Sequence, residues 1–411
     1  NNPFILAIKH HIELAVIKKM LEKGARIKRL DQEDYRTSPL YTAISAGHYQ
    51  MLRYLIEEKK LDIHSEIKNA DFPLHYACTG RLFWEVKEPL TGWLKRQKKE
   101  ANDRYQIVRY LVEKLGYKPG QKANSDFDNS SSLSIAAAWW PKITQYYVNN
   151  YKMDINENYD KGTPPIAHAI KHGNSDSFQS LLKKGAKLKK HFFNTPIAFL
   201  AAKGGSPEII TILVKKGFDF NRIQNKQGTL YLAAANGHFK AVKRLIQLGV
   251  KYPKPGKNSY SILNAAVQSN NISMVLLLLR QSANVNEKDY KGRIPLHYAC
   301  QNNNDTMVKL LLRYRANVNS RDQDGNTPIY NLLSHKREDK QKQYRVLNLL
   351  LKARAKVTIR NKRLKTPLHC YLDNYGSLDG KIIKTLIANG VDINAKDNKG
   401  NTGLFSLVTI G

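Results

Sequence analysis

Apolar positions recur along this chain at helical spacings, in a pattern that predicts short helices in pairs. The clearest copy begins at Asp289-Tyr290-Lys291-Gly292, whose composition is typical of a turn. Pro295 then fits the first turn of a helix, where the missing N–H of proline is not needed. Apolar residues follow at helical spacings, so that each of two successive helices has one inward face. The residues expected on these two faces are Leu296, Ala299, Cys300, Met307, Leu310 and Leu311.

The same pattern returns along the whole chain, mostly at intervals of 32 to 36 residues. The tetrapeptide Ile294-Pro295-Leu296-His297 recurs as Thr366-Pro367-Leu368-His369 and as Phe72-Pro73-Leu74-His75. We call the position of its proline the helix-start slot. From the N-terminus onward, this slot falls at Pro3, Pro39, Pro73, Ser132, Pro165, Ile197 (or Pro196), Thr229, Ser261, Pro295, Pro328, Pro367 and Gly403.

A period of about 33 residues with a Thr-Pro-Leu-His box resembles the ankyrin-repeat family, in which a turn precedes two antiparallel helices. The resemblance covers essentially the whole chain. It implies an all-α solenoid of about twelve helix-turn-helix units with β-turn or hairpin tips, forming one domain over residues 1–411. It also implies that His75, His297 and His369 bond turn backbone between neighbouring units. Segments such as Asn284-Val285-Asn286 resemble the family's closing turn, whose asparagines bond loop backbone.

Two insertions interrupt the period. Residues 81–103 lengthen the third unit, and we expect either an extra helix packed on the solenoid, which we favour, or a partner-binding element. Residues 335–343 lengthen the tenth unit, and we expect a solvated loop there. The last unit stops after its first helix, so we expect a longer chain or covered ends. The residues that give the first insertion its aromatic and basic character are Trp84, Trp93, Lys95 and Arg96.

Composition adds an excess of positive charge to this picture. Lys and Arg number 67 against 34 Asp and Glu, a formal net charge of +33. Such a field attracts acidic proteins, nucleic acid or anionic membrane surfaces, and does not determine the fold. No apolar run approaches the roughly 20 residues that a membrane span needs. Cys78, Cys300 and Cys370 lie far apart, so we expect no disulfide or zinc site, and a reducing, intracellular compartment.

No catalytic constellation emerges from the sequence. There is no GxSxG, phosphate loop or HExxH motif, and the histidines of the box have the structural role described above. His10-His11 and Glu13 have no second ligand pair at a supporting spacing. We therefore expect no catalytic residue, no cofactor and no metal, and a chain that is not an enzyme.

The resemblance implies that partners bind in a groove lined by turn tips and first helices. The residues that this places in the groove are Tyr290, Lys291, Arg293, Gln301, Asn302, Gln323, Asn326, His335, Lys362, Arg363, Lys365, Asn398 and Lys399. Because the tips are mostly basic or polar, our leading hypothesis is a non-catalytic scaffold that binds an acidic protein surface. One alternative is a ribonucleoprotein component that binds RNA phosphates, using the net charge and the 22 tyrosines. Another is an ankyrin-type effector of an intracellular bacterium or virus.

Overall fold

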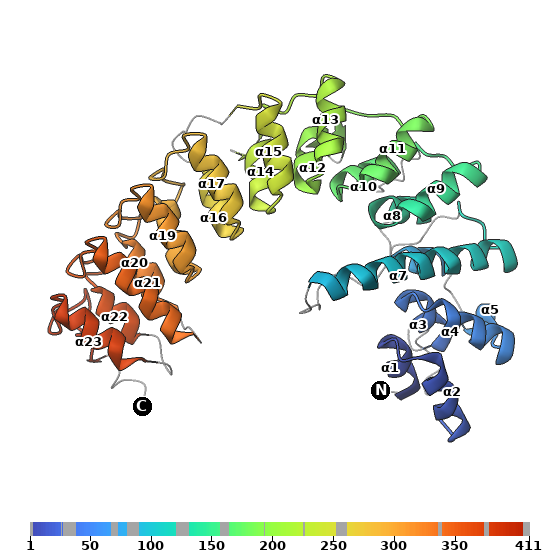
Figure 1. Cartoon of the computed structure of the whole chain (residues 1–411), viewed down its shortest axis with the longest axis horizontal. Helices are drawn as coiled ribbons and strands as arrows, with labels where there is room; N and C mark the ends of the chain where they lie inside the picture. Colours follow the sequence, from blue (N-terminus) through green and yellow to red (C-terminus); the bar gives the residue numbers. More distant parts are fainter. Residues whose placement is uncertain are drawn as a thin grey trace. The chain divides into compact units, whose positions relative to one another are not determined.

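The computed structural model divides the chain into two compact units, Asn1–Ile209 and Ile210–Gly411, each a stack of helix pairs (Figure 1). We describe each unit by itself, and the prediction of one uninterrupted solenoid stays a prediction. Between 90 and 98 only the backbone is described. The residues that the structure describes are 3–25, 27, 38–66, 73–79, 90–120, 131–156, 164–192, 194–224, 227–251, 261–335, 339–373 and 378–405.

The N-terminal unit contains six first helices and their partners among the residues described. The first helices are α1 (Pro3–Lys9), α3 (Pro39–Ala46), α6 (Pro73–Thr79), α8 (Ser132–Trp139), α10 (Pro165–Lys171) and α12 (Ile197–Gly204). The second helices are α2 (Leu14–Glu22), α4 (Tyr49–Arg53), α7 (Leu90–Arg109), α9 (Pro141–Asn150), α11 (Ser175–Lys183) and α13 (Pro207–Lys215), the last of which crosses the unit boundary. A short helix, α5, spans Ile63–Glu66, and π-helical turns at Tyr54–Glu58 and Tyr110–Lys114 extend α4 and α7.

The C-terminal unit continues the same alternation through five pairs. Its first helices are α14 (Thr229–Ala235), α16 (Ile262–Gln268), α18 (Pro295–Gln301), α20 (Pro328–Leu333) and α22 (Pro367–Leu372). Its second helices are α15 (Phe239–Gln247), α17 (Ile272–Arg280), α19 (Asp305–Arg313), α21 (Lys340–Lys352) and α23 (Gly380–Ala388). A short antiparallel hairpin forms one tip in each unit, β1 (His191–Phe192) with β2 (Thr195–Pro196) in the N-terminal unit and β3 (Ile223–Gln224) with β4 (Gln227–Gly228) in the C-terminal unit.

The helix-start slot predicts where first helices begin. Ten of the predicted slot residues are the first residue of a first helix. An eleventh, Ser261, is the N-cap of α16, and its side chain accepts the N–H of Asn264. Of the two alternatives in the sixth unit, Ile197 begins α12 and Pro196 caps it. The Leu404–Val408 helix expected in the last unit lies mostly outside the described residues. None of the described helices combines the length and apolar character of a membrane span.

Buried apolar faces hold neighbouring pairs together. First helices contact first helices, as in α16, α18 and α20, and second helices contact second helices, as in α19 and α21. Met307 and Leu311 of α19 are fully buried, as predicted, but Leu310 is only half-buried. Val308 is buried in the core instead. The helix packs against both α18 and α21, so the adjacent residues Met307 and Val308 both face inward. The prediction for Leu310 was therefore wrong, and the third core residue, Val308, lies two positions earlier.

Both insertions lengthen the start of a second helix. Residues 90–103 form the first turns of α7, which has 20 residues, and are continuous with the second helix of the third unit. They are therefore no separate helix, and residues 81–89 lie outside the described residues. Residues 340–343 form the first turn of α21, capped where the Asp339 side chain accepts the N–H of Lys342 at 2.8 Å. The expected solvated loop was wrong there, since Gln343 is fully buried and donates to the Leu332 carbonyl.

Arg104, in the lengthened helix, is a fully buried cation with partners in several units. Its Nη2 donates to the carbonyl of Ser45 at 2.8 Å, and its Nη1 donates to the carbonyl of Ala77 at 3.0 Å. Nε pairs with Glu100 at 3.0 Å, and the guanidinium lies 5.4 Å from the centre of the Trp140 ring. These bonds provide what a buried charge requires, namely hydrogen bonds and a counter-charge.

The box histidines join each unit to the next. In His297, Nδ1 accepts the N–H of Ile294 at 3.2 Å, so the proton is on Nε2, which lies 3.2 Å from the carbonyl oxygen of Asn326 in the next tip. His369 has the equivalent contacts, which confirms the predicted role for both residues. His75 is buried at the same position of α6.

Asparagine side chains tie the closing turns, as the sequence predicts. Asn286 accepts the N–H of Asn317 at 2.7 Å and donates to the carbonyl of Arg315 at 3.2 Å. Asparagines at the same position of other units make the same bonds. Asn156, Asn221 and Asn319 accept the N–H groups of Lys187, Lys251 and Lys356, respectively. Asn156 and Asn319 also donate to the carbonyls of Gly185 and Arg354. The side chains of these three lysines are exposed, while their backbone N–H groups are bonded.

We predict that Leu311→Ala destabilises the ninth unit by about 2–5 kcal/mol, because it leaves a cavity between α18, α19 and α21. The buried thiol of Cys300 in α18 reports on opening of this region, and that of Cys78 serves as an internal reference. We expect faster thiol labelling at Cys300 alone, measured by mass spectrometry at constant pH. Lys309→Ala, on the exposed side of the same helix, is the control, and equal labelling rates in both variants would contradict the assignment.

We also predict that the ninth unit loses stability as the pH falls. Burial lowers the pKa of His297 below its ordinary value of 6.5, although the Asn326 carbonyl acts in the opposite direction. Below about pH 6.5 the unfolded state therefore binds more protons than the folded state, and stability decreases. Hydrogen exchange, corrected for intrinsic rates, measures the protection of the α18 amides. Between pH 7 and pH 5 this protection should decrease more in the wild type than in His297→Gln.

Candidate functional site

Four tips of the C-terminal unit, at 289–293, 322–326, 361–365 and 397–401, are each built around one acceptor atom. In the tip at 289–293, Oδ1 of Asp289 accepts the N–H groups of Lys291 and Arg293, both at 2.9 Å. Its backbone N–H donates to the Arg293 carbonyl at 3.0 Å, which closes the turn. Gly292 has φ of 71°, a left-handed conformation that glycine adopts without steric cost. The side chains of the tip therefore have a fixed backbone beneath them.

The same construction recurs in the three following tips. Asp322, Asn361 and Asp397 each accept two N–H groups at 2.8–3.0 Å, from the residues two and four positions later. Single hydrogen bonds then join each tip to the next. These inter-tip bonds run from the N–H of Gln323 to the Lys291 carbonyl, from Lys362 to Asp324, and from Asn398 to Arg363, each at 2.9–3.0 Å.

The third tip, 361–365, differs from its neighbours at two positions. Asn361 replaces the aspartate of the other tips, so this tip loses a negative charge but keeps the acceptor. Leu364 stands where the others have glycine, with φ of 55° and 46% of its surface exposed. A leucine in this conformation is strained, because Cβ approaches the following carbonyl oxygen. The result is an exposed apolar side chain flanked by cations.

The structure brings most of the predicted cations to the exposed side of the tips. Lys291, Lys362, Arg363 and Lys399 are exposed, whereas Lys365 pairs with Asp373 at 2.6 Å. Burial acts to lower the pKa of Lys365, but the ion pair with Asp373 raises it above its ordinary value. The four exposed cations are therefore available to a partner, and Lys365 is largely neutralised within the chain.

Three of the four tip carboxylates, those of Asp289, Asp322 and Asp397, are occupied by internal bonds, and that of Asp324 is exposed. The second oxygen of Asp289 accepts the Tyr298 hydroxyl at 2.5 Å, and burial, together with this bond, raises the pKa of Tyr298. Burial acts to raise the pKa of Asp397, but the N–H groups of Asn401 and Lys399 outweigh it and hold the pKa below its ordinary value. Asp289, Asp322 and Asp397 are all buried. The tips therefore present more positive than negative charge to solvent.

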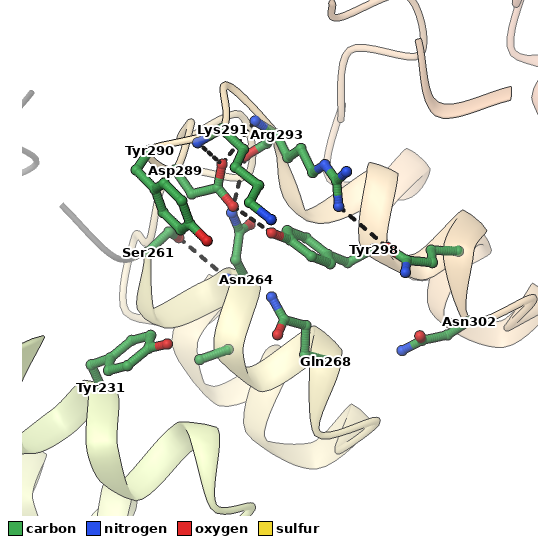
Figure 2. Close-up of a pocket in the computed structure, with 12 residues that line it drawn as sticks. Tyr231, Ser261, Asn264, Gln268, Asp289, Tyr290, Lys291, Arg293, Tyr298 and Asn302 are labelled. Atoms are coloured by element: carbon green, nitrogen blue, oxygen red, sulfur yellow. Dashed lines mark hydrogen bonds between the residues drawn. The ribbon is translucent and has the colours of Figure 1, made fainter. Parts of the chain in front are cut away.

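A polar pocket of about 430 Å³ lies beneath the tip at 289–293 (Figure 2). Three elements form it, namely the tip, α16 and α18, with one residue from α14. Figure 2 shows the tip side chains facing Asn264 and Gln268 of α16, with Tyr298 and Asn302 of α18 at the side. The principal side chains are Tyr231, Asn264, Gln268, Asp289, Tyr290, Lys291, Arg293, Tyr298, Gln301 and Asn302.

Five predicted groove residues meet in this pocket, and five others were missed. Tyr290, Lys291, Arg293, Gln301 and Asn302 had been chosen from tip and helix-end positions. The repeat itself offered a signal for three of the missed residues. Gln268 stands seven positions after its slot, as Asn302 does, and Asn264 and Tyr298 stand three positions after theirs. The residues missed are Tyr231, Asn264, Gln268, Asp289 and Tyr298.

The remaining predicted residues lie elsewhere. Gln323 bonds the first tip, since its Nε2 donates to the Tyr290 carbonyl at 2.6 Å. Asn326 belongs to the second tip, where it bonds Asn361, and Asn398 belongs to the fourth. His335 follows α20 and bonds Ser334 and the Asn331 carbonyl. The insertion residues lie outside the described side chains, Trp84 entirely and Trp93, Lys95 and Arg96 beyond their helical backbone.

Metal-ligating groups do not gather anywhere in the part of the chain that the structure describes. No set of three His, Cys, Asp or Glu side chains lies within ligating reach there. Burial raises the pKa of the Cys78 thiol to about 12 and also raises that of Cys300, so both thiols stay protonated at neutral pH. What this arrangement offers is therefore hydrogen bonding, charge and ring faces for a bound partner.

We predict that Leu364→Gly stabilises the eleventh unit by up to about 1 kcal/mol, because glycine removes the strain of the left-handed conformation. The reciprocal change is Gly400→Ala, at φ of 81° with open space around the position, which should destabilise its tip by about 1 kcal/mol. Hydrogen exchange of the tip amides measures both. A Leu364→Gly variant less stable than the wild type would show that the leucine side chain contributes packing instead.

Comparison with known proteins identifies the repeat. The family model described as ankyrin repeats in three copies matches residues 2–85, 166–255, 198–289 and 263–361, and the single ankyrin repeat model matches 363–398. The stretch between the first two matches contains α7, whose length departs from the repeat. Together these matches cover well over half of the chain.

Three relatives show how widely the similarity extends. The chain is 28% identical over 251 residues to alpha-latrocrustotoxin-Lt1a of Latrodectus tredecimguttatus, an alignment that covers 54% of this chain and 17% of the toxin. It is 27% identical over 283 residues to the ankyrin repeat and KH domain-containing protein mask-1 of Caenorhabditis elegans, covering 68% and 10%. It is 29% identical over 157 residues to the chicken (Gallus gallus) nuclear factor NF-kappa-B p105 subunit, covering 36% and 16%. The chain thus spans less than a fifth of each relative, and what it shares with them is the repeat. By its repeat matches and its helix pairs, the chain belongs to the ankyrin-repeat family.

Proposed function

We propose that this chain is a non-catalytic protein-interaction scaffold whose C-terminal tips bind an acidic protein surface. The observation that carries the proposal is the asymmetry of charge at the tips. Lys291, Lys362, Arg363 and Lys399 are exposed, whereas Asp289, Asp322 and Asp397 are buried and bonded to backbone N–H groups, and Asp324 is the one exposed aspartate of these four tips. An approaching partner therefore meets cations and few carboxylates.

Ankyrin repeats support the interaction part of this proposal, because stacked units provide an extended binding surface. The relatives are ankyrin-repeat proteins of different kinds, which agrees with a module that recognises partners. Complementary charge gives such a surface a fast association rate and selectivity against basic partners.

Leu364 adds an apolar element to the basic surface. It is exposed and strained at a position where the neighbouring tips have glycine, and Lys362 and Arg363 stand beside it. Strained residues persist where the conformation serves a function. An apolar side chain surrounded by cations fits an acidic surface that contains an apolar contact point, because the desolvated centre and the charged rim then match.

We predict that reversing three tip cations weakens binding to a polyanionic polypeptide. The variant is Lys362→Glu, Arg363→Glu and Lys399→Glu, which leaves the Lys365–Asp373 pair intact. We expect about a tenfold or larger loss of affinity for fluorescent poly-L-glutamate, with a weaker dependence on salt. Fluorescence anisotropy at several salt concentrations measures both quantities, and circular dichroism checks that the helices stay folded.

The matched control reverses three exposed lysines on second helices, Lys309→Glu, Lys352→Glu and Lys384→Glu, and has the same net charge. It should keep most of the wild-type affinity. Equal losses in the two variants would show that binding follows net charge and not the tips, which would remove the basis of the proposal. Single-stranded RNA of equal length tests the alternative function. Tighter binding of RNA, with a salt slope that falls by about one for each cation lost, would favour a ribonucleoprotein role.

A further inference from the structure

We propose that the pocket beneath the tip at 289–293 binds an extended peptide segment and holds one Asp or Glu side chain of it against Lys291 and Arg293. This inference rests on the proposed function and assigns a ligand class to one place within it. The pocket is described by its volume of about 430 Å³ and by its polar, aromatic lining. Its size suits one side chain with the flanking peptide groups.

The charges of the pocket favour a carboxylate. Lys291 and Arg293 are its cations, and Asp289 is its one carboxylate. Both oxygens of Asp289 are already used, Oδ1 by two backbone N–H groups and Oδ2 by the Tyr298 hydroxyl at 2.5 Å. Asp289 therefore positions the tip and cannot bind both cations. An incoming carboxylate would provide the counter-charge that they lack within the pocket.

Internal contacts, including a long ion pair with Asp322, orient Arg293 and compensate its charge only in part. Its Nη1 makes a long hydrogen bond of 3.5 Å to Gln301, and its guanidinium lies 5.7 Å from the centre of the Tyr298 ring (Figure 2). The carboxylate of Asp322 is 3.8 Å from its Nε, beyond hydrogen-bonding distance. Such weak internal contacts leave the planar N–H groups of arginine suited to a bidentate carboxylate.

Asn264 favours a ligand that also donates a hydrogen bond. Its Nδ2 donates to the Arg293 carbonyl at 3.0 Å, which fixes the orientation of the amide. Its Oδ1 is then buried, and no donor in the described part of the chain reaches it. A buried carbonyl oxygen without a donor is unfavourable, so a ligand that supplies an N–H relieves this cost. An extended peptide supplies N–H groups beside its carboxylate, whereas a phosphodiester group supplies only acceptors.

The remaining lining fits an extended backbone. Gln268, Gln301 and Asn302 come from two adjacent first helices and carry amides that both donate and accept. Peptide groups have the same two capacities at regular intervals, so amide side chains pair with them readily. The rings of Tyr231 and Tyr290 add flat apolar faces against which side chains of the segment pack.

A double-mutant cycle on a selected peptide tests the inference. Random peptides displayed on phage are selected against the whole chain, and we expect the binders to share an Asp or Glu at one position. One binder and its acid-to-amide version are then titrated against the wild type, Lys291→Gln and Arg293→Gln. Each protein variant should reduce the affinity of the acidic peptide by about tenfold and that of the amide version by less than about threefold.

Lys291→Gln keeps the test valid if Arg293→Gln fails to fold, because Lys291 is exposed. Lys309→Gln, on the exposed side of α19, removes the same charge outside the pocket and should leave the affinity unchanged. The inference is overturned if the selection yields no binders or binders without a shared acidic residue. It is also overturned if the variants reduce the affinity of the acidic and amide peptides equally. A third contradicting outcome is single-stranded RNA that displaces the peptide and whose own affinity is reduced equally by Lys291→Gln and Arg293→Gln. If poly-L-glutamate binding still depends on the third and fourth tips in these cases, the scaffold function stands and only the pocket assignment fails.

Discussion

Each C-terminal tip depends on a single side-chain oxygen that accepts two backbone N–H groups. Asp289, Asp322, Asn361 and Asp397 provide it, at distances of 2.8–3.0 Å. An amide oxygen serves as well as a carboxylate, because the bond requires an acceptor and not a charge. The tip therefore tolerates Asn361 and becomes more basic without losing its shape. Geometry and surface charge are set independently at this position, which lets the tips differ in charge on one scaffold.

The periodic part of this fold could be predicted from the sequence, because local bonds determine it. Pro295 begins a helix, and the imidazole of His297 bonds its own turn and the next one, so both act wherever the box occurs. Leu310 was misassigned because a helix packed on two sides buries adjacent positions, such as Met307 and Val308, which a single-face pattern does not indicate. The second insertion was misread because a solvated loop and a helix extension have similar polar composition, whereas the first was predicted as helical but is continuous with α7 over residues 90–103.

The candidate site was predictable only in part, for a different physical reason. Tip cations such as Lys362 follow directly from turn positions. The pocket needs residues of three successive units to lie side by side, and Asn264 and Tyr298 gain their roles from hydrogen bonds to Arg293 and Asp289. No spacing within one unit encodes those bonds. Nor does the sequence show that Asp289, Asp322 and Asp397 are buried and bonded internally, so counting charges alone underestimates how basic the surface of the tips is.

Arg104 has a consequence for how the N-terminal unit opens. In a linear repeat protein each unit interacts with its immediate neighbours, so the ends fray one unit at a time. Arg104 of the third unit couples both of its neighbours through one side chain, since it bonds Ser45 in the second unit and Ala77 in its own and contacts Trp140 in the fourth. Separating either neighbour removes a partner of this buried cation and exposes it. These three units should therefore unfold as one cooperative block, larger than the single repeat.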